Sequence, residues 1–227
     1  MTATADLTAL NTLQLAATAQ RLVTVTSQDQ LRAELVQPAT AVPINVLGGG
    51  NNVVLHETLP GTTLLMNIMG REALSDDGRH VIARAGAGEN WHEWVLWCHH
   101  RGFHGLANLA LIPGSVGAAP IQNIGAYGVE VAQCIQAVHA MHRETGESAV
   151  LPPQQCEFRY RDSVFKHPKG EGWVITAVDF ALDRGAPVEA NYPTLRARLS
   201  EAELTHDAVL ASVIAIRRER LPDPVIT

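Results

Sequence analysis

The sequence predicts an α+β protein with two lobes, the first formed by residues 1–70 and the second by residues 71–227. A strand-like run, a capped helix and a second apolar run indicate a small β-α-β unit in the first lobe. Strand-like segments separated by turn-rich stretches indicate an antiparallel sheet in the second. The length of 227 residues exceeds the usual size of one domain, which predicts either one large domain or two lobes that share a ligand.

The first lobe begins with the strand-like run RLVTVT, which leads into a helix. Ser27 followed by Gln30 is an N-terminal capping pattern, and Leu31 and Leu35 repeat at helical spacing. The apolar run AVPINVL then ends at the glycines 48–50, so a strand is expected to deliver them to a ligand-binding edge. GTTLLMNI predicts a further strand.

The second lobe begins with a predicted hairpin, because Asp77-Gly78 lies between two strand-like segments. NWHEWVLWCHHRG predicts a helix that is capped by Asn90 and ends at Gly102. Strands are expected at IQAVHAMH and GWVITAVDFAL, and a last helix over residues 205–218, with Pro222 ending it. The apolar stripe of this helix is expected to be Val209, Leu210, Val213 and Ile214.

Composition narrows the class of function. The net charge of -6 and the lack of a Lys/Arg run argue against a nucleic-acid partner. No apolar stretch reaches 18 residues and the N-terminus does not resemble a signal peptide, so no membrane partner and a cytoplasmic location are expected. Cys98, Cys134 and Cys156 lie far apart without CxxC spacing and are interpreted as buried thiols.

Two glycine-rich segments indicate where a ligand binds. Backbone without Cβ atoms approaches an anion closely, so the glycines 48–50 suit a diphosphate, with a simple tight turn as the alternative. Neither a P-loop nor GxGxxG is present. The segment IPGSVGAAPIQNIGAYG supplies four more glycines with Ser115, Gln122 and Asn123, and its alternative is a packed core with glycine bends. Together the two segments favour one extended ligand bound between the lobes.

EFRYRDSVFK concentrates positive charge in an otherwise acidic chain. In strand geometry Arg159 and Arg161 share one face and Tyr160 lies on the other. An arginine held in a pocket binds a carboxylate or stabilises developing negative charge, whereas the alternative is an exposed ion pair with Asp162 or Glu157.

The histidines near Cys98 do not form a metal-binding pattern. His99 and His100 are adjacent and point to different faces of a helix, and no carboxylate follows them or His104 at ligand spacing. No metal is therefore assigned. No GxSxG segment indicates a serine nucleophile either.

A resemblance to a known family is carried by five segments, in this order: LGGGNN, AGAGENWHEWV, NLALIPGSVGAAPIQNIGAYGVEV, FRYRDSVFK and RLPDP. Together they resemble the UDP-N-acetylenolpyruvoylglucosamine reductases, flavoenzymes of bacterial peptidoglycan synthesis. The resemblance covers nearly the whole chain. It implies the two-lobed α+β FAD-binding fold of the vanillyl-alcohol oxidase and para-cresol methylhydroxylase type.

The resemblance also implies the cofactors and the site. FAD is the expected cofactor, NADPH the hydride donor and a UDP-sugar the substrate. Arg161 is the expected catalytic residue, facing the substrate carboxylate and the enolate. Tyr160, Tyr192 and Arg220 are expected to bind substrate, although the family has lysine where Arg220 stands. The residues expected to bind FAD are Gly48, Gly49, Gly50, Asn51, Asn52, Ser115, Gly117, Asn123 and Gly125.

The chain departs from the family pattern after LPDP. There the resemblance implies a segment with a proton-donating serine and a substrate-binding domain with a catalytic glutamate, neither of which can be assigned in these 227 residues. The chain is therefore expected to be the FAD-binding part of the reductase, poorly active alone. An FAD-dependent oxidase of the same fold and a non-catalytic nucleotide-binding module remain alternatives.

Overall fold

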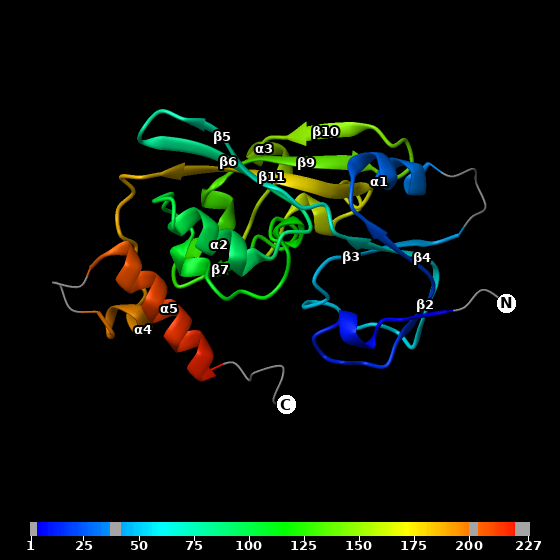
Figure 1. Ribbon diagram of the computed structural model, residues 1–227, viewed down its shortest axis with the longest axis horizontal. Coiled ribbons are helices and arrows are strands. Elements are labelled where there is room, and N and C mark those ends of the chain that lie inside the picture. Colours follow the sequence, from blue (N-terminus) through cyan, green and yellow to red (C-terminus); the bar gives the residue numbers. More distant parts are fainter. Residues whose placement is uncertain (1–3, 37–41, 200–203, 221–227) are drawn as a thin grey trace.

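The computed structural model describes residues 4–36, 42–199 and 204–220. Two sheets account for most of the strands. A four-stranded sheet from the first part of the chain lies at one end of the molecule, and a five-stranded sheet lies beside it above α2. The helices α4 and α5 lie at the opposite end (Figure 1). The two sheets thus meet in the middle of the molecule.

The first sheet has the order β1-β2-β4-β3. β1 (Ala5–Asp6) is antiparallel to β2 (Thr18–Val25). β2 and β3 (Ile44–Leu47) are both parallel to β4 (Thr58–Met66), which lies between them. α1 (Gln28–Leu35) connects β2 to β3. The predicted β-α-β unit is confirmed, with a later strand inserted at its centre.

α1 is capped as the sequence predicts and also contacts the second sheet. The Ser27 hydroxyl accepts the Gln30 N–H at 3.1 Å, and the Gln30 side chain accepts the Thr26 N–H at 2.9 Å. Arg32 Nε donates to the carbonyl of Gly146 at 3.1 Å, and Gly146 lies in the turn after β9. α1 therefore ties the first sheet to the second.

Replacing Ser27 with alanine is expected to lower the free energy of unfolding by about 1 kcal/mol, because the Gln30 N–H loses its partner. Urea unfolding followed by circular dichroism measures this change. Ser27→Asp restores an acceptor and is the matched control, expected to stay close to the parent. Equal midpoints for the parent and Ser27→Ala would contradict the role of the cap.

The second sheet is antiparallel throughout, as predicted, in the order β10-β9-β11-β6-β5. Its strands are β5 (Arg71–Asp76), β6 (His80–Gly86), β9 (Ile135–His142), β10 (Ser148–Leu151) and β11 (Trp173–Asp183). The predicted hairpin joins β5 to β6, and Gly78 adopts a φ of +92° in its turn. β11 lies at the centre, buried along most of its length.

Two helices cover the main core with their apolar faces. α2 (Trp91–His99) begins after Asn90, whose side chain accepts the Glu93 N–H, and its Trp94 ring lies 5.3 Å from the Phe180 ring. α5 (His206–Arg220) buries Val209, Leu210, Val213 and Ile216. Ile214 packs against the core as expected but is only half-buried, and Ile216, which the expected stripe omits, is fully buried. Pro222 lies outside the described residues.

The remaining described elements are short. They are η1 (Thr8–Leu10), η2 (Ala107–Leu109), η3 (Val116–Ala118), β7 (Gly125–Ala126), β8 (Val129–Glu130), η4 (Val131–Gln133), α3 (Pro153–Cys156), η5 (Val164–Lys166) and α4 (Pro193–Arg196). The glycine-rich stretch 105–128 is thus folded as a series of turns packed against the core. Among the described residues, no helix combines the length and apolarity that crossing a bilayer demands.

The three cysteines are free and buried, as predicted. Burial raises the pKa of each thiol, to about 11 for Cys134, to about 12 for Cys156 and well above the usual range for Cys98. These thiols therefore stay protonated at neutral pH.

Candidate functional site

The two glycine-rich segments meet where the sheets join. An added Cβ at Gly48 would lie 2.7 Å from Ser115 Oγ, and one at Gly49 would lie 3.1 Å from Gly114 Cα. Farther along the same loop, Asn52 Nδ2 donates to Gln122 Oε1 at 2.7 Å. Segments about 65 residues apart in the sequence thus form one surface, as the glycine pattern predicts.

Hydrogen bonds to the segment between β6 and α2 fix the second glycine segment. The Gly117 N–H donates to the Ala87 carbonyl at 2.9 Å, and the Val116 N–H to the Glu89 carbonyl at 2.8 Å. The buried Glu89 carboxylate accepts the Gly70 N–H at 2.8 Å and forms an ion pair with Arg71 at 2.5 Å. The segment after β6 therefore holds the glycine loop and, through Glu89, also contacts Gly70 on the connection between the two sheets.

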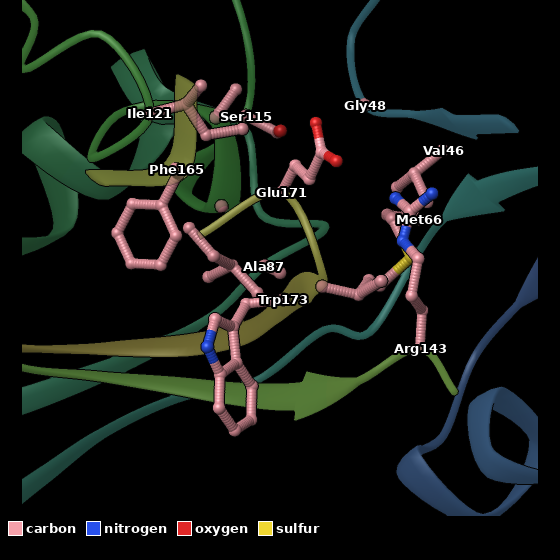
Figure 2. Close-up of a pocket in the computed structure, with 14 residues that line it drawn as sticks. Val46, Gly48, Met66, Ala87, Ser115, Ile121, Arg143, Phe165, Glu171 and Trp173 are labelled. Atoms are coloured by element: carbon pink, nitrogen blue, oxygen red, sulfur yellow. The ribbon is translucent and has the colours of Figure 1, made fainter. Parts of the chain in front are cut away.

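A cavity of about 300 Å³ lies where the two sheets meet (Figure 2). Its apolar lining includes Val46, Met66, Phe165, Trp173, Val174 and Ile175. Its polar and backbone lining includes Gly48, Ser115, Gly117, Arg143 and Glu171. Both sheets and both glycine segments contribute to the lining. We call the part lined by the apolar side chains the apolar slot, and the part bordered by Gly48, Ser115 and Gly117 the rim.

The shape of this rim fits the diphosphate of a dinucleotide. Added Cβ atoms at Gly48 and Gly117 would lie 2.7 Å from Ser115 Oγ and 2.6 Å from Ala87 Cβ, closer than real Cβ contacts allow. Glycine is therefore required at both positions for the two segments to pack this closely, and the backbone without Cβ atoms that borders the cavity leaves room for an anion. The apolar slot beside the rim suits a planar ring.

Asn123 is occupied inside the protein. Its Nδ2 donates to Glu130 Oε2 and to the Arg159 carbonyl, both at 2.9 Å, and its Oδ1 accepts the Ala132 N–H at 3.1 Å. The residue is 1% exposed. Its backbone N–H also donates to the Pro120 carbonyl at 3.2 Å. Asn123 therefore holds the glycine segment in shape, and its contact with FAD stays a prediction.

Arg161 lies on a tight turn and not on a strand, so the strand geometry expected for this segment is wrong. Arg159 and Asp162 exchange two backbone hydrogen bonds at 3.0 and 3.1 Å, which leaves Tyr160 and Arg161 at the tip. Arg161 adopts a φ of +53°. A two-residue turn removes the strict alternation of a strand, so both side chains are exposed at the tip.

The Arg161 guanidinium reaches toward the second glycine segment. Its Nη2 donates to the Gly125 carbonyl at 2.5 Å. The alternative ion pairs are absent within the described residues, because Asp162 pairs with His167 at 2.8 Å and Glu157 pairs with Lys169. Arg161 is therefore close to a residue predicted to bind FAD, on the outside of the cavity.

Tyr192 and Arg220 lie in the helical part of the second half of the chain. The Tyr192 ring meets the Tyr127 ring edge-on at 5.5 Å, and Arg220 is the exposed last residue of α5. Neither lines the cavity. Tyr192 thus contacts the end of the second glycine segment through Tyr127, whereas no contact places Arg220 at either segment, and the substrate-binding roles of both stay predictions.

The histidines expected to lack a metal are engaged in contacts between helices. His99 Nε2 lies 2.7 Å from Asp207 Oδ1, and the His104 ring stacks on the His206 ring at 3.7 Å. In the part of the chain that the structure describes, no group of three or more His, Cys, Asp or Glu side chains has metal-binding geometry. These contacts join the end of α2 to the start of α5.

Sequence reasoning missed Arg143 and Glu171 in the cavity lining. Arg143 lies in the turn after β9, and Glu171 comes just before β11. The backbone N–H of Arg143 donates to the Gly172 carbonyl at 2.8 Å, which brings the two residues to one end of the second sheet. Charged residues in turn-rich segments carry no local signal for such a site.

Comparison with known proteins decides the family. A family model described as the FAD binding domain matches residues 19–151. The UDP-N-acetylenolpyruvoylglucosamine reductase of an Azoarcus species is 43% identical, over 99% of this chain and 67% of the relative. This chain belongs to the UDP-N-acetylenolpyruvoylglucosamine reductase family. The reductase of Alcanivorax borkumensis is 44% identical, over 97% of this chain but only 64% of its own length.

Solved structures agree with the fold. The UDP-N-acetylenolpyruvylglucosamine reductase of Thermus caldophilus matches with a TM-score of 0.68 and 26% identity, over 97% of this chain and 70% of that one. A solvent-stable cholesterol oxidase matches with a TM-score of 0.51 at 12% identity, a likeness of fold alone. This reductase-family chain therefore has the predicted FAD-binding fold of the vanillyl-alcohol oxidase type.

Proposed function

We propose that these 227 residues are the FAD-binding part of a reductase that converts UDP-N-acetylenolpyruvoylglucosamine to UDP-N-acetylmuramate. The observation that carries the proposal is the meeting of the two glycine segments at the rim of the cavity. The family membership supports FAD as the ligand. Residues 1–70 and 71–227 act in this proposal as two lobes that hold the cofactor between them, in the cytoplasm.

The proposed FAD contacts follow the two segments. They are Gly48, Gly49, Gly50, Asn51, Asn52, Ser115, Gly117, Asn123 and Gly125. Bound FAD would supply hydride transfer, with NADPH as the donor. The chain orients the dinucleotide through its backbone at the rim and keeps water from the apolar slot.

Substrate recognition is proposed for the exposed turn and the helical region. Arg161 offers a guanidinium to the substrate carboxylate and to negative charge that develops on the enolate. Tyr160 shares its turn. Tyr192 and Arg220 are proposed to contact the UDP part of the substrate. The chain spans about 64% of the length of the Alcanivorax relative. The complete reaction is therefore proposed for the reductase as a whole and not for these 227 residues alone.

The purified 227-residue chain is expected to bind FAD and to show little turnover. Its visible absorption spectrum tests the first part, and NADPH oxidation with UDP-N-acetylenolpyruvoylglucosamine tests the second. A chain that takes up no FAD would contradict the proposal and favour a non-catalytic module. Oxygen consumption with alcohols would favour an oxidase of the same fold, and turnover at the rate of a full-length reductase would contradict the expected incompleteness.

A further inference from the structure

Arg143 and Glu171 are two charged side chains of the cavity that the proposed function leaves without a role. Figure 2 shows Arg143 beside Val46 and Met66, with Glu171 nearer to Ser115. Within the described residues, neither side chain takes part in an ion pair or in a side-chain hydrogen bond. Two opposite charges thus border one apolar slot and remain available to a ligand.

The Arg143 donor is the clearer sign of a missing partner. Its Nε is buried and has no hydrogen-bond partner among the described residues. Native proteins rarely leave a buried donor unpaired, so a buried donor that no protein group accepts indicates a bound ligand or an ordered water. The donor lines the cavity, so the partner is expected there.

The order of groups along the cleft decides which part of FAD reaches Arg143. β3 passes Val46 before it delivers Gly48 to the rim, and the chain then continues to Asn52, which bonds Gln122. Arg143 lies at the Val46 end. The Arg161 turn lies beyond the other end, at Gly125. A dinucleotide whose diphosphate sits at Gly48 therefore extends toward Arg143 on one side and toward Arg161 on the other.

The reacting ring must be the half that faces Arg161, because the substrate-binding groups are outside the cavity. The cavity between the two sheets then receives the other half. Its volume of about 300 Å³ lies at the lower limit of ligand pockets, roughly 300–1,000 Å³, which suits one nucleoside better than a whole dinucleotide. Met66 and Trp173 supply apolar surface for a flat base.

We propose that Arg143 and Glu171 bind the adenosine half of FAD, with Arg143 donating to the adenine ring nitrogens and Glu171 accepting from the ribose hydroxyls. This inference rests on the proposed function. Guanidinium N–H groups are donors only and an ionised carboxylate is an acceptor only, which matches the acceptors of adenine and the hydroxyl groups of ribose. The pair acts as a determinant of FAD binding and takes no part in the chemistry.

Titration of the FAD-free chain with FAD and with FMN tests the role of Arg143. Arg143→Met is expected to weaken FAD binding about tenfold to a hundredfold and to leave FMN binding within about twofold, because FMN lacks the adenosine half. Arg79→Met, on an exposed ion pair with Asp183, is the matched control and keeps parental FAD affinity. Unchanged FAD affinity in Arg143→Met, or an equal loss for FMN, would overturn the assignment.

Displacement of FAD by ADP and by 2′-deoxy-ADP tests Glu171 separately. The parent is expected to bind ADP about tenfold more tightly, and Glu171→Ala is expected to bind the two nucleotides alike. A parent that does not discriminate between them would overturn the ribose contact. A parent that binds no FAD would overturn the proposed function itself, whereas normal FAD binding with insensitive variants overturns this inference alone. Thermal unfolding followed by circular dichroism confirms that each variant is folded.

Discussion

Replacing Gly48 with valine is expected to weaken FAD binding about a hundredfold or more. The new side chain starts 2.7 Å from Ser115 Oγ and fills the rim of the cavity that the diphosphate needs. A hundredfold loss of affinity corresponds to about 2.8 kcal/mol of binding free energy, the size expected when a side chain takes the space of the phosphate contacts. Quenching of flavin fluorescence on titration measures the affinity.

The choice of position and a control variant distinguish loss of the binding site from loss of the fold. The nearest atom to the added Cβ is a side-chain hydroxyl, which rotates away more readily than backbone moves. Gly185→Val is the matched control, because its Cβ would meet only ordinary contacts at 3.4 Å and beyond, and Gly185 does not line the cavity. A Gly48→Val chain with parental FAD affinity would show that the diphosphate lies elsewhere.

Replacing Asp179 with alanine is expected to lower the free energy of unfolding by about 2–3 kcal/mol, less than the 3–5 kcal/mol typical of a fully buried pair. Asp179, on β11, accepts from Arg84 at 2.6 and 2.9 Å and contacts His139 Nε2 at 2.8 Å. Removing the carboxylate leaves a guanidinium that is only partly buried without its anion. Urea unfolding at pH 7 measures the difference.

The Asp179 carboxylate also makes the free energy of unfolding depend on pH in the acidic range. Burial favours the neutral form of Asp179, but hydrogen bonds from Arg84 and His139 outweigh it and lower the pKa to about 2. Because this pKa lies below the ordinary value of 3.8, the contribution is complete above pH 4 and is lost as the pH falls from about 4 to 2. Its size is about 2 kcal/mol.

Unfolding curves at pH 6, 4 and 2.5 for the parent and Asp179→Ala test this dependence. The parent is expected to lose more stability between pH 4 and 2.5 than the variant does. Asp29→Ala, at an exposed position on α1, is the matched control and keeps the parental slope. Parallel curves for the parent and Asp179→Ala would contradict the assigned pKa.

Elements with strong local signals are the ones that sequence predicts well. Asn90 caps the start of α2, and Gly102 ends the turn that follows this helix with a φ of +69°. The insertion of β4 between β2 and β3 has no such signal, because strand order depends on long-range pairing. The predicted stripe of α5 omits Ile216, because several apolar residues near the end of this helix fit a buried face and only packing selects among them.

The candidate site likewise has features that the sequence predicts and features that it does not. The contact between Gly48 and Ser115 is predictable from the sequence. Two separate glycine-rich segments in one chain indicate that both approach the same ligand closely. The turn at Arg161 is not, because an alternating sequence fits a strand as well as a hairpin tip. Arg143 and Glu171 escape sequence reasoning, since pairing between distant segments brings them to the cavity.

The bond from Arg32 of α1 to the Gly146 carbonyl joins the two halves of the molecule independently of any ligand. A flavin nucleotide therefore enters a slot whose walls are already assembled, and little binding free energy goes into ordering the protein. Cofactor uptake should then follow simple one-step kinetics, with a rate proportional to FAD concentration and no slow closing phase.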